Sequence, residues 1–509
     1  MQYFLAYDVG TSSVKAILTD TSGKIYGNAV VDYPLYMPNA GWVEQEPQDY
    51  WNAICKATKK IISKTNIEIQ QIKGLAFSTQ AMGVIPVDVQ GNVLYRNISW
   101  VDGRAEEQAK KAMRYFGGKL IFKAIVGIEL TGKDVIPKII WLKDKQPEIY
   151  NSTHKILDVN GYLKMKCTGK MVAEWSGACS YAFDVKKKDW ERLFFKLCKI
   201  DLNKLPDLVH SVDLVGKLTE QAAQEMGLHT NVEVYGGCDD TQSAAVGTTA
   251  IAEGEPHIYV GTSAWIGVST EKAPKFKNGV FTLQSADPTK NLVVGITESA
   301  GINTQWLVNN FYANEAKEME EQTFFSFLED EIQTTKAGAD YLIMTPWFLG
   351  ERCPVGTTTT RSTLFNLTHQ HTKAHIARAN FEGIAYNLRW SIRNFEKDFG
   401  FNIQQIKITG GGSRNKTFMQ IIADVTKCTI ITTSQPLNAG AFGAAMCAMV
   451  GSKALSGFSD IEKLIQTTGE FIPNKANEAI YDELFETYQS IYHQLDKTYQ
   501  TINKKRFEF

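Results

Sequence analysis

The stretches AYDVGTSSVKAIL (residues 6–18) and HIYVGTSAWIGVS (residues 257–269) share the letters VGTS, with an apolar run on each side. This pattern predicts a strand, a tight turn and a second strand at both places. Glycine lets the backbone come close to a ligand, and the Thr and Ser hydroxyls add donors to the exposed backbone N–H groups. Both turns therefore suit phosphate oxygens. A chance match of four letters is the alternative.

The segments around the two turns predict two similar α/β halves. In each half the strands of the turn are followed by alternating helices and strands, and a small-residue helix is predicted at 241–250 and again at 438–451. We expect two domains, residues 1–248 and 249–509, related by internal duplication. Their phosphate turns would face each other across a cleft, and closure of the halves would exclude water.

Length and composition exclude several classes of protein. A chain of 509 residues exceeds what one hydrophobic core usually supports. The 54 basic and 55 acidic residues give a net charge of −1, so we expect no nucleic-acid or membrane partner and small molecules instead. Eight cysteines without a C-x-x-C pair favour a reduced, cytoplasmic setting, and no apolar stretch approaches the ~18 residues of a membrane span.

Two further motifs leave alternatives open. GGGSRNKT (410–417) nearly matches a G-x-x-x-x-G-K-[ST] phosphate loop, but Asn415 stands where the second glycine is required. It is otherwise a tight strand-to-helix turn, or a surface on which adenine and ribose lie while Asn415 bonds the base edge. His369, His371 and His375 suggest a metal site, yet no Cys or carboxylate completes the set, and we expect loop and first-turn residues.

The order of these motifs along the chain resembles the FGGY family of sugar kinases, in the actin and Hsp70 superfamily, and the pattern is nearest to the xylulokinases. The motifs are DVGTSSVK (8–15), GWVEQEP (41–47), WVDGRA (100–105), GGCDD (236–240), FLGERCP (348–354), LFNLTHQ…FEG (364–383), TGGGSRN (409–415) and AGAFGAA (439–445). Asn366 and Asn380 depart from the family's usual residues. The resemblance implies two actin-like (ribonuclease H-like) domains, with sugar and catalytic aspartate in the first and nucleotide in the second.

Phosphoryl transfer to a hydroxyl needs a metal ion, hydrogen-bond donors that position the phosphates, and a base that accepts the proton of the hydroxyl. The sequence offers a candidate for each. Asp8, at the end of the first strand, can reach the Mg²⁺ of bound ATP, through water as that ion prefers. Thr11, Ser12 and Lys15 would lie near the transferred phosphate. A solvated turn carboxylate is the alternative for Asp8.

Two neighbouring aspartates compete for the role of base. The family places the base seven residues before a glycine of the small-residue helix, which selects Asp240 before Gly247. Counting from the preceding glycine pair, Gly236 and Gly237, selects Asp239 instead. We prefer Asp240, because helix geometry fixes the later spacing more tightly than a loop fixes the earlier one. Without the resemblance, such a pair is typical of a helix cap.

The resemblance also implies sugar and nucleotide contacts. Gln80, Asp102 and Arg104 would address sugar hydroxyls, whereas Ala81 and Met82 replace the Met-His pair of xylulokinases and the Arg-Glu pair of glycerol kinases. Nucleotide contacts are expected at Gly261, Thr262, Gly301, Gln305, Gly411, Gly412 and Asn415.

We expect ATP-dependent phosphorylation of a primary hydroxyl of a small sugar, first of all a pentulose such as xylulose. Another sugar, a polyol or an aldonate such as gluconate is the alternative substrate. An actin- or Hsp70-like ATPase and a sugar sensor without transfer activity are the alternatives from other classes. A homodimer is expected from the resemblance alone.

Overall fold

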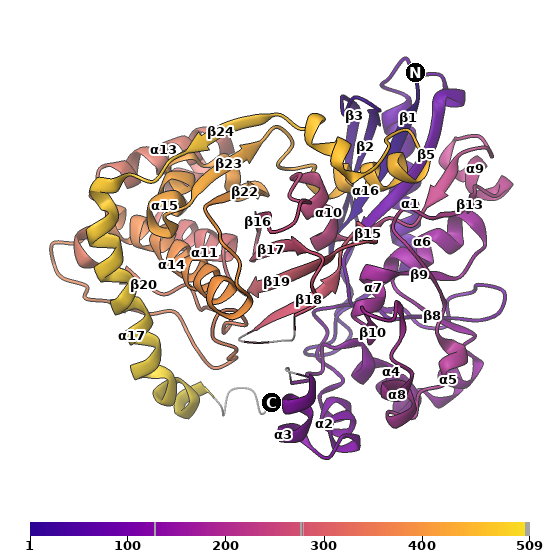
Figure 1. The fold of residues 1–509 in the computed structure, drawn as a ribbon, viewed down its shortest axis with the longest axis horizontal. Helices are drawn as coiled ribbons and strands as arrows, with labels where there is room; N and C mark the ends of the chain where they lie inside the picture. The colour runs from indigo at the N-terminus through magenta and orange to yellow at the C-terminus, as the bar shows by residue number, and fades with distance from the viewer. Residues whose placement is uncertain (127–128, 275–276, 278, 504–509) are drawn as a thin grey trace.

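The computed structural model describes residues 1–509 except 127–128, 275–276, 278 and 504–509. The chain forms two α/β halves side by side, indigo to magenta on the right of Figure 1 and orange to yellow on the left. Each half contains a seven-stranded sheet. The predicted two-domain α/β fold is confirmed.

The sheet of the N-terminal half has the order β13-β14-β5-β1-β2-β3, and β15 pairs with the end of β5. β1 is antiparallel to β2 and parallel to β5. The glycine turn joins the first two strands, as the sequence predicts. The bounds are β1 (Tyr3–Val9), β2 (Ser13–Asp20), β3 (Ile25–Asp32), β5 (Ile72–Thr79), β13 (Leu214–Lys217), β14 (Glu233–Tyr235) and β15 (Cys238–Asp239).

The sheet of the C-terminal half repeats this arrangement in the order β18-β19-β17-β16-β22-β23-β24. β16 is antiparallel to β17 and parallel to β22, so β16 corresponds to β1, β17 to β2 and β22 to β5. This shared topology supports internal duplication over a chance match of VGTS. The bounds are β16 (Pro256–Val260), β17 (Ala264–Thr270), β18 (Val280–Gln284), β19 (Asn291–Thr297), β22 (Gln405–Thr409), β23 (Thr429–Thr433) and β24 (Thr467–Phe471).

Helices cover both sheets, and one of them crosses from one half to the other. α16 (Ala439–Gly451) is encoded in the C-terminal half but packs against β1, β5 and α10 (Asp240–Gly247) of the N-terminal half, where Figure 1 shows it in yellow among the indigo strands. The approach is close: a Cβ on Gly443 would lie 2.0 Å from the Ser243 carbonyl oxygen, and one on Gly247 2.0 Å from that of Ala439. The small residues of both helices are what permits this packing.

The remaining helices and short strand pairs complete the two halves. In the N-terminal half the helices are α1 (Pro47–Ile62), α2 (Glu106–Tyr115), α3 (Lys119–Val126), α4 (Val135–Lys145), α5 (Pro147–Ser152), α6 (Val159–Thr168), α7 (Trp175–Cys179), α8 (Arg192–Leu197) and α9 (Glu220–Met226). In the C-terminal half they are α11 (Gly301–Phe311), α12 (Ala313–Glu318), α13 (Glu321–Gln333), α14 (Lys373–Phe399), α15 (Lys416–Thr426) and α17 (Glu478–Asn503). The short pairs are β4 (Glu44–Gln45) with β7 (Asn97–Ile98), β6 (Ile85–Val87) with β8 (Lys155–Leu157), β9 (Val172–Glu174) with β12 (Asp207–Val209), β10 (Phe183–Asp184) with β11 (Asp189–Trp190), and β20 (Ile343–Met344) with β21 (Leu364–Phe365).

Candidate active site

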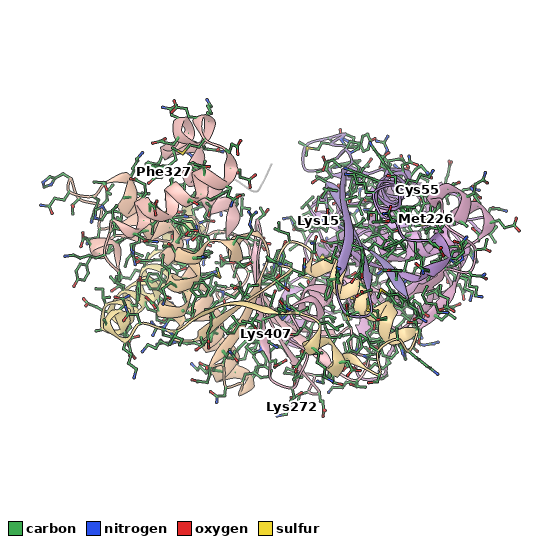
Figure 2. The ribbon with its side chains drawn as sticks, turned by 90° about the horizontal axis from the view of Figure 1, so that it is seen from above. Lys15, Cys55, Met226, Lys272, Phe327 and Lys407 are labelled. Atoms are coloured by element: carbon green, nitrogen blue, oxygen red, sulfur yellow. The ribbon has the colours of Figure 1, made fainter. Side chains whose placement is uncertain are left out.

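The first glycine turn carries a carboxylate and a lysine side by side. Asp8 near the end of β1 pairs in register with Lys15 on β2, so both side chains leave the same face of the sheet. The Ser78 hydroxyl donates to Asp8 Oδ1 at 3.0 Å. Burial raises the pKa of Asp8, while Lys15 and Ser78 lower it. Figure 2 shows Lys15 on the side of its half that faces the other half.

Gly440, in the first turn of α16, approaches Asp8 more closely than any side chain would allow. A Cβ at this position would lie 2.7–2.9 Å from the atoms of the Asp8 carboxyl group. The sequence motif AGAFGAA contains this glycine, but nothing in the local pattern indicates which carboxylate it would meet. Gly440 is therefore a site residue that the sequence analysis missed.

Asp239 and Asp240 lie in different surroundings. Asp240 is the first residue of α10 and half-buried, and burial and then the charge of Asp8 raise its pKa to about 6. Asp239 is buried, and its Oδ1 lies 3.4 Å from where a Cβ on Gly177 would stand. Its pKa is raised well above the usual range by burial and by the charges of Asp158, Asp240 and Glu174, with Lys164 opposing.

The second glycine turn is braced by the start of α11. The Gly301 N–H donates to the Gly261 carbonyl oxygen at 2.8 Å, and the Ile302 N–H to that of Thr262 at 3.1 Å. A Cβ on Gly301 would lie 2.5 Å from the Gly261 oxygen, so only glycine fits there. The structure thus brings Gly261 and Thr262 of the second VGTS turn next to Gly301, and the contact of these residues with a nucleotide stays a prediction.

Tyr259 lies near the end of β16, next to the second turn. Its ring stacks on Trp265 at 4.1 Å and covers Gly261, where a Cβ would lie 2.5 Å from a ring carbon. Burial raises the pKa of Tyr259, and the charges of Asp8 and Asp240 raise it further. Both carboxylates therefore act electrostatically on the end of β16, and a single site formed by the two turns stays a prediction.

The third glycine motif forms a 3₁₀ turn (Gly411–Arg414) before α15. A Cβ on Gly412 would meet the Val260 side chain at 2.5 Å, whereas one on Gly411 would meet open space. Asn415 caps α15: its Oδ1 accepts from the Phe418 N–H at 2.7 Å, and its buried Nδ2 has no partner within the described residues. This free amide can bond the edge of a base. Gln305 is exposed on α11, with its Nε2 donating to Asn309.

A buried chain of amides connects the predicted sugar loop to the first phosphate turn. Gln80 Nε2 donates to Gln45 Oε1 at 3.1 Å, and Gln45 Nε2 donates to the Thr11 carbonyl oxygen at 2.6 Å. Gln80 Oε1 is buried without a partner in the described part of the chain. Gln80 therefore has an acceptor left for a sugar hydroxyl, and Gln45, which the sequence analysis missed, positions it.

The next residues of this loop are Ala81 and Met82, both half-buried. Met82 has a φ of 63°, a left-handed conformation that costs a non-glycine residue about 1–2 kcal/mol. Trp100 of the neighbouring loop donates from Nε1 to Thr11 Oγ1 at 3.0 Å. Both loops thus border the first phosphate turn.

Asp102 and Arg104 bond each other. The Asp102 carboxylate is fully buried, lies 2.7 Å from an Arg104 guanidinium nitrogen, and also accepts from the Val43 N–H. Arg104 makes a second ion pair with Glu44 at 2.9 Å and lies 3.9 Å above the Trp42 ring. This pair shapes the loop that follows Trp100, and its contact with a sugar stays a prediction.

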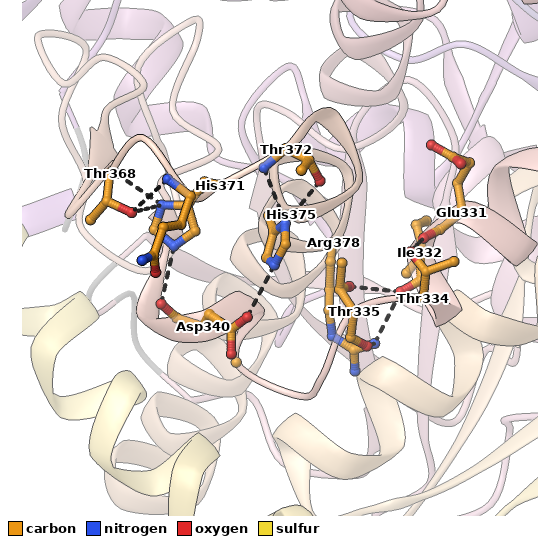
Figure 3. Close-up of polar contacts among 12 residues, drawn as sticks. Glu331, Ile332, Thr334, Thr335, Asp340, Thr368, His371, Thr372, His375 and Arg378 are labelled. Carbon is orange, nitrogen blue, oxygen red and sulfur yellow. Dashed lines mark hydrogen bonds and ion pairs between the residues drawn. The ribbon is translucent and has the colours of Figure 1, made fainter.

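His371 and His375 lie around the start of α14 (Figure 3), and His369 lies in the turn that precedes it. His375 Nδ1 accepts from the Thr372 N–H at 3.2 Å, forming a capping box, and His375 Nε2 lies 3.1 Å from Asp340 Oδ2. His371 contacts Thr368 and the Asp340 carbonyl oxygen. Their bonds serve the turn and the helix cap, and no group of three metal-ligating side chains occurs among the described residues.

Similar proteins cover nearly the whole chain. Family models described as the N-terminal and C-terminal domains of the FGGY family of carbohydrate kinases match residues 3–247 and 257–452. A xylulose kinase of Bacillus subtilis is 30% identical over 96% of this chain and 96% of its own, and a gluconokinase of the same organism is 24% identical over 96% and 94%.

Two solved structures from Lactobacillus acidophilus share the fold. A ligand-bound xylulose kinase aligns with a TM-score of 0.89 at 25% identity, covering 98% of this chain and 100% of its own. A gluconate kinase aligns with a TM-score of 0.88 at 25% identity, covering 98% and 99%.

Proposed function

The chain belongs to the FGGY family of carbohydrate kinases, and from this we propose that it transfers the terminal phosphate of ATP to a primary hydroxyl of a pentulose, first of all xylulose. The observation that carries the proposal is that α16 contacts both segments that bear the carboxylates: Gly440 lies against the Asp8 carboxyl group, and α16 packs closely on α10, which begins at Asp240. Two turns rich in N–H and hydroxyl donors on either side of two carboxylates suit a polyphosphate and a reacting alcohol.

The surroundings of Asp8 fit Mg²⁺. Asp8 supplies a hard oxygen ligand, Gly440 leaves no side chain beside it, and the neighbouring charge of Asp240 favours a cation between the two. When bound with ATP, the ion would neutralise charge on the phosphates. Asp8 would hold it, while Lys15, Thr11 and Ser12 would position the transferred phosphate.

Asp240 is the proposed base. Its pKa of about 6 leaves the carboxylate ionised at neutral pH and able to accept the proton of the attacking hydroxyl. Asp239 is buried against Gly177, and burial together with the charges of Asp158, Asp240 and Glu174 raises its pKa well above the usual range. This difference in surroundings supports the choice made from the helix spacing.

The sugar would lie between the loops 80–83 and 99–104, next to the first phosphate turn. Gln80 Oε1 accepts from a hydroxyl, and Met82 presents an apolar surface where xylulokinases carry histidine. The relatives that support xylulose are the xylulose kinase at 30% identity and the ligand-bound xylulose kinase structure. Gluconate is the second candidate, because a gluconate kinase structure aligns almost as well and Met82 removes the xylulokinase signature.

ADP release in the presence of Mg-ATP, measured against xylulose, ribulose, fuculose, gluconate, erythritol and glycerol, tests the proposal. Strong stimulation by xylulose is expected. Stimulation by gluconate alone would replace the substrate and keep the kinase. Steady ATP hydrolysis that no sugar changes would favour an actin- or Hsp70-like ATPase, and ATP and sugar binding without turnover would favour a sensor.

Location and assembly stay predictions: a cytoplasmic protein, a homodimer, and no nucleic-acid partner. In the part of the chain that the structure describes, no helix combines the length and apolar character that crossing a bilayer requires.

A further inference from the structure

A buried lysine connects the two predicted sugar loops. Lys138 lies on α4, and its side chain is completely inaccessible to solvent. Its Nζ donates to the Met82 carbonyl oxygen at 3.2 Å and to the Ser99 carbonyl oxygen at 2.8 Å. Met82 belongs to the loop after β5 and Ser99 opens the loop that contains Trp100, so one amine holds two segments that are separate in sequence.

Burial of the Lys138 amine at this position is energetically unfavourable. Lysine is almost never fully buried unless it is paired, and here no carboxylate lies within ion-pair distance in the described residues. Burial lowers the pKa of Lys138 to about 7, with the charges of Asp102 and Asp134 opposing the effect. An apolar residue would suit the surrounding core better, so the side chain needs another explanation than packing.

The backbone of Met82 supplies that explanation. Its φ of 63° is unfavourable for a methionine, and the carbonyl of this same residue accepts the Lys138 bond. The next residue is held too, because the Tyr181 hydroxyl donates to the Gly83 carbonyl oxygen at 2.6 Å. The strained conformation is thus fixed by buried donors from two other segments, at the residue that replaces the family's histidine.

We propose that Lys138 is a positioning residue for the sugar: it holds the Met82 and Ser99 carbonyls at a fixed separation and so sets the width of the sugar site. It acts through the two loops and not by contact, since it is inaccessible. The inference rests on the proposed function, which places the sugar between these loops.

The test compares Lys138→Met with a matched control, Lys155→Met. Methionine keeps the length of the side chain and removes the donors. Lys155 also bridges two carbonyl oxygens, of Asn203 at 2.9 Å and Leu205 at 2.7 Å, but away from the sugar loops. Lys138→Met is expected to raise the KM for the sugar at least tenfold and leave the KM for ATP within twofold, whereas Lys155→Met changes neither.

A merely structural role for Lys138 would move the melting temperature, or both KM values and kcat together, and would not separate the two substrates. An unchanged sugar KM in Lys138→Met, with wild-type turnover normal, overturns the positioning role alone. Absence of wild-type turnover with every sugar overturns the proposed function and this inference together. Should Lys138→Met fail to fold, Lys138→Gln, which keeps N–H donors on a shorter neutral side chain, must show the selective rise in sugar KM.

Discussion

Replacing Asp240 by asparagine tests the proposed mechanism most directly. The amide keeps the size of the side chain at the start of α10 and removes the proton acceptor. Because a positioned base contributes roughly 10²–10⁴-fold to the rate, kcat should fall by that factor while the KM for ATP changes little.

The pH dependence of the activity provides a second, independent test of the role of Asp240. A base must be ionised to act, and the pKa of Asp240 is raised to about 6, so activity is lost as pH falls through that value. At pH 5 only about one tenth of such a group is ionised, and kcat/KM for the wild type should fall to about one tenth of its plateau. This acid limb should be absent in Asp240→Asn.

The assay is coupled ADP release between pH 5 and 8 at constant ionic strength, with Asp239→Asn as the control. Burial and neighbouring carboxylates oppose the ionisation of Asp239, so an amide should be tolerated there and should leave both the rate and the acid limb in place. Full activity in Asp240→Asn together with loss in Asp239→Asn would refute the reasoning and assign the base to Asp239.

Four further substitutions give three separate tests. Met82→His should raise kcat/KM for xylulose about tenfold, the contribution of one hydrogen bond, and histidine tolerates the positive φ at this position. An unchanged sugar preference in the substrate panel would exclude residue 82 as the determinant of sugar specificity. Gly440→Ala should lower kcat about 10–100-fold by displacing the Asp8 carboxyl group, with little change in melting temperature. In Gly443→Ala the new Cβ would lie 2.0 Å from a backbone oxygen, so this substitution should lower the free energy of unfolding by about 1–3 kcal/mol. Calorimetry that shows the larger loss of stability in Gly440→Ala would contradict the packing argument. Asn415→Asp keeps the oxygen that caps α15 and removes the free Nδ2, so the melting temperature should stay the same while the KM for ATP rises about tenfold. Equal KM values for ATP would mean that this amide does not contact the adenine base.

The sequence predicts the parts of this fold that are determined locally. A strand, a glycine turn and a second strand can be predicted at 6–18 and 257–269, because the apolar runs and the glycine determine the structure of only a few neighbouring residues. The order of the motifs then indicates the duplication. The choice between Asp239 and Asp240 is different. It depends on what each carboxyl group faces across the molecule, which a count of residues cannot provide.

The residues that the sequence analysis missed share one property. Gln45, Lys138 and Gly440 act through contacts with segments at least 34 residues away: Thr11 for Gln45, Met82 and Ser99 for Lys138, and Asp8 for Gly440. For each of these residues, the surrounding sequence predicts the helix or strand that contains it but not the distant segment that it contacts. Asp102 and Arg104 are the converse case, because the motif suggests ligand contacts while the structure pairs them with each other.

The position of α16 has a consequence for dividing the molecule. Its side chains Phe442, Met446 and Met449 form one buried cluster with Phe4 and Ile17 of the N-terminal sheet. A fragment ending at residue 248 would leave that face of the sheet exposed to water, and the complementary fragment would carry an apolar helix without a partner. The two halves repeat each other in topology, yet each is completed by the other, and they should be recovered as folded protein only when both are made together.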